Sequence, residues 1–89
     1  INISRGPIVD ETSLIRALQT RSIAGAAVDV FDKEPLPADH PFRGIDNLLL
    51  SPHMGYVTTE AYTVFYPQVV EDIEGFLRGS PVRILNGNN

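Results

Sequence analysis

Three short apolar segments of the chain have the composition of buried β-strands: residues 1–4, 23–31 and 48–51. The second consists mostly of small or β-branched apolar residues without clean alternation, as expected of a strand buried on both faces. A turn over residues 5–7 ends the first strand, and Pro52 ends the third. The pattern therefore predicts three short strands.

Two further segments repeat apolar side chains at helical spacing. The first follows Asp10, a good N-cap, and should run to about Thr20. The second should be capped by Thr58 or Thr59 and end at Gly79. The apolar positions are Leu14, Ile15, Ala17 and Leu18 in the first helix, and Tyr62, Phe65, Val69, Ile73, Phe76 and Leu77 in the second.

Prolines shape two parts of this pattern. Pro67 lies within the second helix and should kink or split it, because its ring removes one hydrogen bond and crowds the preceding turn. Residues 32–46 contain three prolines, which favour extended or turn conformations, so a loop is expected there. A brief helical turn over residues 41–43 is expected within this loop.

The order strand, helix, strand, long loop, strand, helix is typical of a parallel α/β sheet. In such sheets, ligands bind at the edge formed by the carboxyl ends of the strands. Arg5, Glu34 and His53 all lie at or just past a predicted strand end. The sequence therefore predicts an α/β fold with a site at that edge.

These three side chains suit the oxidation or reduction of a small acid. The guanidinium of Arg5 can hold a carboxylate through two parallel hydrogen bonds and so fix the neighbouring carbon. His53 can give a proton to a ketone oxygen or take one from a hydroxyl. Glu34, if close to that imidazole, would favour its protonated form.

Composition excludes several other classes of protein. The net charge is −4 and the seven Lys and Arg residues are scattered, so nucleic-acid binding is not expected. No apolar run approaches the roughly 20 residues that span a bilayer, so no membrane association is expected. The chain has no cysteine, which excludes disulfides and is compatible with a cytoplasmic protein. The spacing of Asp39, His40 and His53 does not match a zinc site, and no metal is expected.

Three motifs surround the candidate residues in a recognisable order. They read Asn2-Ile3-Ser4-Arg5-Gly6, then Val28-Asp29-Val30-Phe31 running into Glu34-Pro35, then Ser51-Pro52-His53-Met54-Gly55. Over residues 1–86 the chain resembles the C-terminal part of the NAD-binding domain of the D-isomer-specific 2-hydroxyacid dehydrogenases. The resemblance implies a partial Rossmann-like, doubly wound parallel sheet, forming the C-terminal half of a dinucleotide-binding domain.

The resemblance also implies catalytic roles, residue by residue. Arg5 falls on the arginine that binds the substrate carboxylate, and His53 falls on the acid/base. Glu34 falls on the glutamate that supports this histidine. The implied reaction is hydride transfer between a nicotinamide cofactor and a small D-2-hydroxy acid or 2-oxo acid.

A cofactor site is implied by the same motifs. Asp29 falls on an aspartate that contacts the nicotinamide carboxamide, while Ser4 and Gly55 match positions lining the nicotinamide pocket. Arg5 and His53 border this pocket as well. Asp29 has support of its own, because a carboxylate at the end of a buried strand needs partners, and a ligand amide would be one.

Parts of such a domain are not found among the 89 residues. The seven glycines nowhere make the G-x-G-x-x-G spacing that lets a turn approach pyrophosphate, and the acidic residue that holds the ribose cannot be assigned. NAD is the expected cofactor, with NADP left open. We expect residues 1–89 to be a fragment of one NAD(P)-binding domain with a C-terminal helix, without the phosphate-binding half or the substrate domain.

Alternatives remain at this point. Taken singly, Arg5 could be a solvated turn residue, Glu34 a surface charge and His53 a helix cap. The family pattern is also retained by NAD-responsive transcriptional corepressors, which are not enzymes, and a structural remnant of a degraded gene is a third possibility. The substrate is left open among glyoxylate, hydroxypyruvate, lactate-type and phosphoglycerate-type acids, and a homodimer is implied by resemblance alone.

Overall fold

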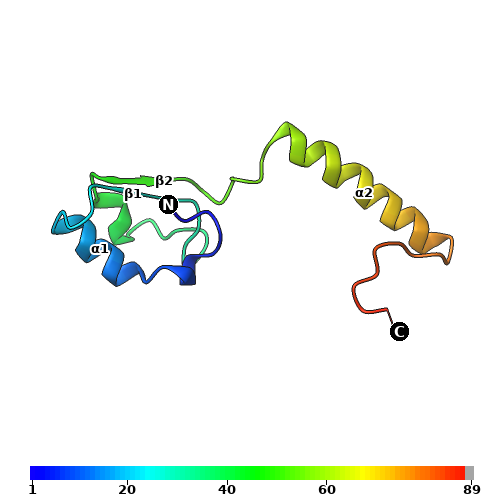
Figure 1. Ribbon diagram of the computed structural model, residues 1–89, viewed down its shortest axis with the longest axis horizontal. Coiled ribbons are helices and arrows are strands. Elements are labelled where there is room, and N and C mark those ends of the chain that lie inside the picture. Colours follow the sequence, from blue (N-terminus) through cyan, green and yellow to red (C-terminus); the bar gives the residue numbers. More distant parts are fainter. Residues whose placement is uncertain (88–89) are drawn as a thin grey trace. The chain divides into compact units, whose positions relative to one another are not determined.

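The computed structural model describes residues 1–87 and divides the chain into two compact units, Ile1–Gly55 and Tyr56–Asn89 (Figure 1). In chain order the first unit contains a 3-10 helix η1 (Gly6–Ile8), helix α1 (Glu11–Gln19), strand β1 (Ala26–Val28), a 3-10 helix η2 (Pro41–Gly44) and strand β2 (Leu48–Leu50). The second unit contains one long helix, α2 (Thr59–Leu77). No helix within residues 1–87 combines the length and the apolar character needed to cross a membrane.

The sheet of the first unit is parallel, as predicted. β1 pairs with β2 in the register Ala26 with Leu48 through Val28 with Leu50. The expected first strand is reduced to a single parallel bridge, in which Asn2 pairs with Val28. The order and direction of the predicted elements are therefore confirmed, although the first strand is too short to be assigned as one.

The second strand is shorter than the predicted range of residues 23–31. The side chain of Asn47 donates to the carbonyl oxygen of Ala24 at 3.2 Å and to that of Leu18 at 3.3 Å. These bonds engage the backbone before β1, so that the parallel ladder begins only at Ala26. The bond to Ala24 thus comes from the side chain of the residue directly before β2, which the apolar composition of residues 23–31 does not reveal.

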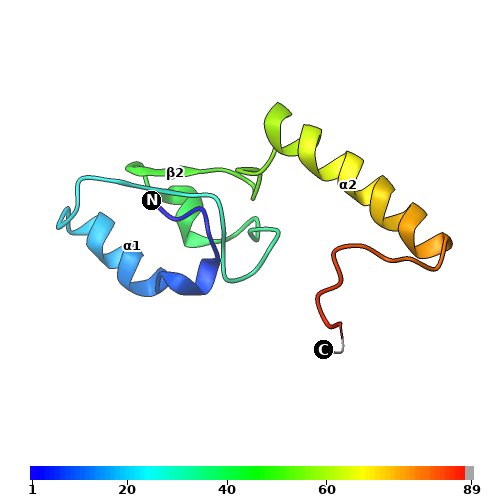
Figure 2. The ribbon, with the colours of Figure 1, turned by 45° about the vertical axis from the view of Figure 1, so that its right-hand side comes forward.

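The core of the first unit lies between α1 and one side of the sheet (Figure 2). The side chain of Asp10 caps α1 by accepting from the backbone N–H of Ser13 at 2.7 Å, as predicted. Five buried side chains from α1, the sheet and the following loop form the cluster: Leu18, Val28, Phe31, Phe42 and Leu48. The predicted helical turn is present as η2 and contributes Phe42 to this core.

The long helix of the second unit begins and ends as predicted. Thr58 caps α2 by accepting from the N–H of Ala61 at 3.0 Å. Gly79, with φ of 72°, ends it, because its N–H bonds to Phe76 O at 3.0 Å and the N–H of Ser80 bonds to Gly75 O at 2.9 Å. This pair of bonds is the Schellman motif, in which glycine at the left-handed position satisfies the last carbonyl groups.

Pro67 does not divide the helix. α2 runs through this residue as one element of 19 residues, so the alternative of two separate helices is wrong. The second half of α2 is held by Arg83 from the segment that follows, which pairs with Glu71 at 2.6 Å and with Asp72 at 2.9 Å.

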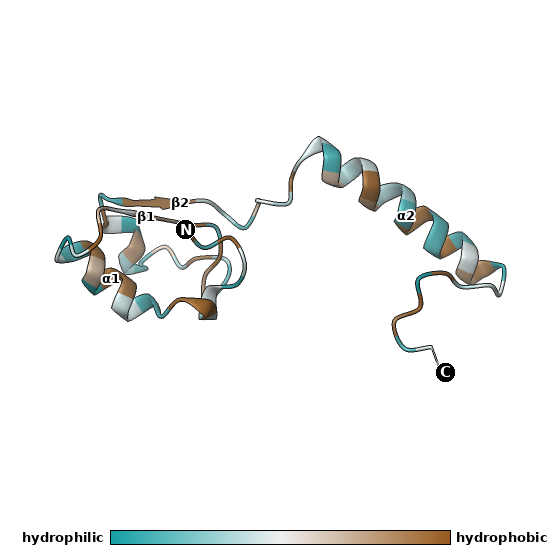
Figure 3. Ribbon diagram, in the orientation of Figure 1, coloured by the Kyte–Doolittle hydropathy of each residue, from teal (hydrophilic) through white to brown (hydrophobic). Residues whose placement is uncertain are grey.

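Apolar residues recur along α2 (Figure 3), and many of their side chains are exposed. The exposed members on this helix are Tyr62, Val64, Phe65, Tyr66, Val69, Val70, Ile73, Phe76 and Leu77. In the first unit, Ile3 and Leu49 are also exposed. The described residues therefore present uncovered apolar surface in both units.

Candidate active site

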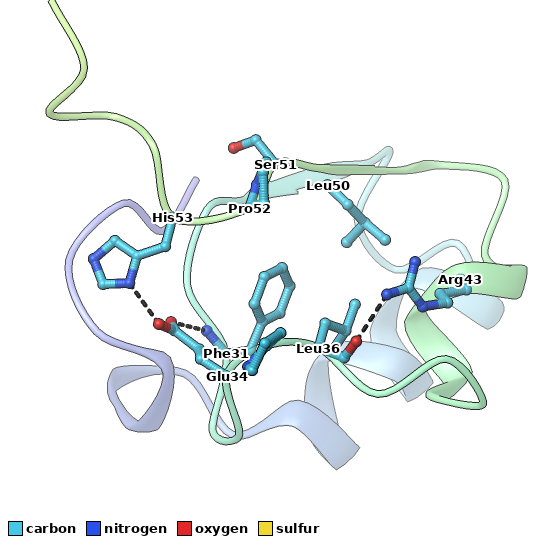
Figure 4. Close-up of a pocket in the computed structure, with 9 residues that line it drawn as sticks. Phe31, Glu34, Leu36, Arg43, Leu50, Ser51, Pro52 and His53 are labelled. Atoms are coloured by element: carbon cyan, nitrogen blue, oxygen red, sulfur yellow. Dashed lines mark hydrogen bonds and ion pairs between the residues drawn. The ribbon is translucent and has the colours of Figure 1, made fainter.

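A hydrogen-bonded pair of Glu34 and His53 is at the centre of the candidate site (Figure 4). His53 Nδ1 lies 2.6 Å from Glu34 Oε2, and each side chain is about one-third exposed, at 36% and 34%. The other oxygen of Glu34 accepts from the N–H of Phe31 at 3.0 Å, which fixes the carboxylate. The sequence placed these two residues 19 positions apart, and the fold brings them into direct contact.

The charge of Glu34 determines which ring nitrogen of His53 carries a proton. The pKa of Glu34 is lowered, first by the hydrogen bond from His53 and then by the Phe31 N–H, with smaller contributions from the charges of His53 and Arg5. An ionised carboxylate only accepts hydrogen bonds, so Nδ1 must be the donor in this pair. Proton exchange with a ligand would therefore take place at Nε2.

His53 sits in an unusual backbone conformation directly after Pro52. Its φ is 55°, in the left-handed region that side chains with a Cβ rarely adopt. Such a conformation persists only where the surrounding structure holds it in place. The groups that hold this turn belong in large part to Asp29.

Asp29 follows β1 and is buried, with 4% of its surface exposed. Its Oδ1 accepts from the Ser51 hydroxyl and from the Met54 N–H at 3.0 Å, and its Oδ2 accepts from the Gly55 N–H at 2.9 Å. These three donors, with the Ser51 hydroxyl first, lower the pKa of Asp29 in spite of its burial. The prediction that this carboxylate needs partners is confirmed, and the partners come from the turn around His53.

Gly55 contributes space as well as a donor. A Cβ at this position would lie 3.1 Å from Asp29 Oδ2, closer than ordinary van der Waals contact. The backbone of Gly55 is therefore able to approach the carboxylate because it has no side chain.

A second turn carries Arg5. The side chain of Asn2, only 7% exposed, donates to Arg5 O at 2.9 Å and accepts from the Ser4 N–H at 3.2 Å. Gly6 packs directly on the following loop, since a Cβ there would lie 2.1 Å from the carbonyl carbon of Phe31. Arg5 itself is exposed and donates to Ser4 O at 2.7 Å.

The structure thus brings the predicted site residues into two groups. His53 is held by Glu34 on its ring and by Asp29 on its backbone turn, together with Gly55. Arg5 and Ser4 share the other turn, and the positive charge of Arg5 makes a small contribution to the lowered pKa of Glu34. Their roles toward a cofactor or substrate stay predictions.

The sequence alone assigns no individual role to Asn2 or Ser51. Asn2 shapes the Arg5 turn, and Ser51 donates its hydroxyl to Asp29. The position of Asn2 inside the Asn-x-Ser-Arg-Gly motif was the available signal. The role of Ser51 depends on the pairing of β1 with β2, which places it beside Asp29.

A pocket of about 510 Å³ opens beside the Glu34–His53 pair (Figure 4). Its walls are largely apolar, and they include Phe31, Leu36 and Leu50. Arg43 lies at its rim, where the guanidinium donates to Leu36 O and Pro37 O, each at 2.8 Å.

The second histidine of the chain has structural partners. His40 Nε2 lies 2.8 Å from Glu11 Oε2, and its Nδ1 accepts from the Phe42 N–H at 3.1 Å. Both ring nitrogens of His40 therefore have partners within the first unit, and its side chain is largely buried. Across residues 1–87 no three potential ligand side chains gather in a way that would hold a metal ion.

A parallel sheet with Arg5, Glu34 and His53 near its carboxyl edge is the arrangement of α/β domains that bind ligands at that edge. The sequence profile of the family described as "D-isomer specific 2-hydroxyacid dehydrogenase, NAD binding domain" matches residues 1–55. The chain belongs to this family. The matched range coincides with the first compact unit, so both candidate turns and the Glu34–His53 pair lie inside it.

Individual relatives agree with this assignment. The chain is 41% identical over 87 residues to a glyoxylate reductase of Thermofilum pendens, covering 97% of this chain and 26% of the relative. It is 45% identical over 83 residues to a D-3-phosphoglycerate dehydrogenase of Synechocystis, covering 93% of this chain and 15% of the relative. The chain thus spans about a quarter or less of the length of these relatives.

A solved structure shares the fold. A D-isomer specific 2-hydroxyacid dehydrogenase from Xanthobacter autotrophicus Py2, in complex with NADPH and MES, is 41% identical to the chain with a TM-score of 0.68. The match covers 99% of this chain and 35% of that one. The predicted fold class, the C-terminal half of a Rossmann-like NAD-binding domain, is therefore confirmed.

Proposed function

We propose that the protein carrying this chain transfers a hydride between a nicotinamide cofactor and C2 of a small D-2-hydroxy acid or 2-oxo acid. The observation that carries the proposal is the Glu34–His53 pair, held at 2.6 Å at the carboxyl edge of the parallel sheet in an NAD-binding family. An imidazole oriented by a carboxylate is a suitable acid/base for a carbonyl or alcohol.

The residues present fit a nicotinamide group. A carboxylate can accept about four hydrogen bonds. Asp29 accepts three from the described residues, which leaves capacity for one more donor, such as a carboxamide N–H. NAD is the proposed cofactor and NADP is its alternative, since the neighbour of known structure holds NADPH.

In the direction of reduction, Arg5 would bind the carboxylate of the 2-oxo acid and orient its carbonyl group. His53 would donate the Nε2 proton to the carbonyl oxygen, so that the oxygen becomes a hydroxyl group. The bound reduced nicotinamide supplies the hydride that adds to C2. Glu34 would stabilise the positive imidazolium before this transfer. Afterwards it would keep the neutral ring in the same orientation through the hydrogen bond from Nδ1.

The proposal is tested with the longest natural polypeptide that contains this chain. Oxidation of NADH and NADPH is followed with glyoxylate, hydroxypyruvate and larger 2-oxo acids. His53→Ala should lower kcat by about 100-fold or more, because general acid/base catalysis contributes roughly 10²- to 10⁴-fold. Arg5→Ala should mainly raise KM for the acid, whereas Arg21→Ala, which removes an exposed ion pair to Asp46, should change neither constant.

A non-enzymatic NAD-responsive corepressor is the second candidate, because such proteins retain the Arg, Glu and His pattern. No turnover with any acid, together with tight NADH binding, would favour it. The substrate itself is left to this experiment, since the relatives include both a glyoxylate reductase and a phosphoglycerate dehydrogenase.

The proposal extends to a homodimer located in the cytoplasm. The family resemblance supports the homodimer, and the absence of cysteine is compatible with a reducing compartment. Light scattering on the same polypeptide should give twice the monomer mass, and a monomer mass would contradict this part of the proposal.

A further inference from the structure

We propose that Asp29 is a positioning residue that holds the turn carrying His53 through hydrogen bonds. Ser51 and Gly55 contribute by donating to its carboxylate. The inference rests on the proposed function in one respect, namely that His53 is the acid/base. It adds a role for Asp29 that does not require contact with the cofactor.

The bonds of Asp29 lie on both sides of the histidine. The Ser51 hydroxyl precedes His53 by two residues, and the N–H groups of Met54 and Gly55 follow it directly. A single carboxylate therefore holds both flanks of the turn, while Glu34 holds the ring. Backbone and ring are thus fixed by two different acids.

The turn has reason to need such an anchor. His53 has φ of 55°, which local backbone preference disfavours, and the preceding Pro52 has no N–H to donate. Asp29 is itself a firm support, because it is buried at the end of β1 and its N–H bonds to Asn2 O at 2.9 Å. The left-handed conformation of His53 is therefore stabilised by a residue at the end of β1.

The glycine at position 55 is explained by its close approach to Asp29 and not by a need for backbone flexibility. Its φ does not lie in the left-handed region, so glycine is not needed there for backbone freedom. What disfavours a larger residue is the approach to Asp29 Oδ2, which a Cβ at 3.1 Å would displace. The absence of a side chain at Gly55 thus allows its N–H to approach the carboxylate of Asp29.

The functional consequence concerns the placement of Nε2. A displacement of about 1 Å at a reacting group can cost about 100-fold in rate. Loss of the anchor should therefore lower kcat for every acid, with little change in the KM that reports carboxylate binding. If Asp29 acted only by accepting a hydrogen bond from the nicotinamide carboxamide, its loss would lower kcat only with cofactors that carry this carboxamide.

The test uses Asp29→Asn in the longest natural polypeptide that contains this chain. The amide has nearly the same shape but replaces one acceptor by a donor that faces N–H groups. We expect kcat to fall by about 10- to 100-fold, with KM for the acid changed by less than about threefold. A loss of at least about tenfold should also appear with the 3-acetylpyridine analogue of NADH, which has no carboxamide N–H. A loss seen with NADH and absent with the analogue would overturn the proposal in favour of direct cofactor contact.

Gly55→Ala provides a second variant that leaves Asp29 intact, and it should lower kcat in the same way. Gly44→Ala is the matched control, because no described atom lies within 4 Å of a Cβ there and its φ is not left-handed. Gly44→Ala should keep full kcat. Equal effects of the two substitutions would contradict the proposal.

Hydrogen exchange of the Met54 and Gly55 amides gives a readout that needs no turnover. Both amides should be protected in the parent protein and should exchange at least tenfold faster in Asp29→Asn, with the amides of α1 unchanged. Unchanged exchange at Met54 and Gly55 would overturn the anchor even if the protein is inactive. Faster exchange in a protein with no dehydrogenase activity would instead reject the proposed function and retain the anchor.

Discussion

At the scale of single residues, the site is organised by the carboxylates of Asp29 and Glu34 and by their hydrogen-bond donors. The sequence predicted the carboxylates but not all of the donors. The sequence predicts that Asp29 must be compensated, because it ends a buried strand. It cannot predict that the compensating donors come from residues 51–55, since that depends on the pairing of β1 with β2. The contact of Glu34 with His53 was implied by family resemblance, and the structure supplies its geometry.

Acid should destabilise the first unit through these same groups. The pKa of Glu34 is lowered mainly by the His53 hydrogen bond, and that of Asp29 mainly by the Ser51 hydroxyl. A carboxyl group with a lowered pKa in the folded state stabilises the fold above its unfolded pKa of about 4, and this contribution is lost as pH falls through the folded value.

The free energy of unfolding should therefore decrease as pH falls below about 4, as measured by denaturant unfolding at a series of pH values. Glu34→Gln should reduce this dependence on pH. A parent protein whose stability rises over the same acid range would contradict the assignment.

Gly6 should tolerate no side chain. In Gly6→Ala the new Cβ would meet the Phe31 backbone at 2.1 Å, so the Arg5 turn must move. Overpacking of this kind costs about 1–3 kcal/mol, and KM for the acid should rise as Arg5 is displaced. Thermal unfolding and steady-state kinetics measure both effects, with Gly44→Ala as the control.

At the scale of elements, caps and helix faces were predictable because their determinants are local. Asp10, Thr58 and Gly79 each do what their position in the pattern predicts. Strand lengths were not predictable, because the backbone before β1 bonds to the side chain of Asn47, the residue that directly precedes β2. Pro67 was judged by a local rule alone, and α2 continues through it.

The packing of α1 on the sheet should depend on Leu18. This side chain is fully buried at 0% exposure, whereas Leu49 on β2 is 70% exposed. Leu18→Ala should lower the free energy of unfolding by about 2–5 kcal/mol, and Leu49→Ala should change it far less. Denaturant titration followed by circular dichroism makes the comparison, and equal losses would contradict this description of the core.

At the scale of the whole molecule, the chain has a small core and much exposed apolar surface. The core cluster holds five buried residues, while α2 and Leu49 expose large apolar side chains. Solvent-exposed apolar patches of this kind are typical of surfaces that other protein covers. This chain spans about a quarter of the glyoxylate reductase of Thermofilum pendens, so that relative contains a large additional part of chain.

An isolated 89-residue chain should therefore associate. Sedimentation of the purified chain at increasing concentration should show a rising average mass, because exposed apolar faces pair with one another. A monomer that unfolds cooperatively at all concentrations would show that the exposed apolar side chains of the first unit and α2 do not need to be buried by another protein surface.

The central claim is that His53, oriented by Glu34, exchanges a proton with a 2-oxo acid. The most direct test is single-turnover NADH oxidation by the longest natural polypeptide containing this chain, in the parent protein and in His53→Ala. We predict that the parent reduces at least one small 2-oxo acid and that His53→Ala slows the chemical step by about 100-fold or more, with NADH binding retained. Hydride transfer at the parental rate in His53→Ala would contradict the account.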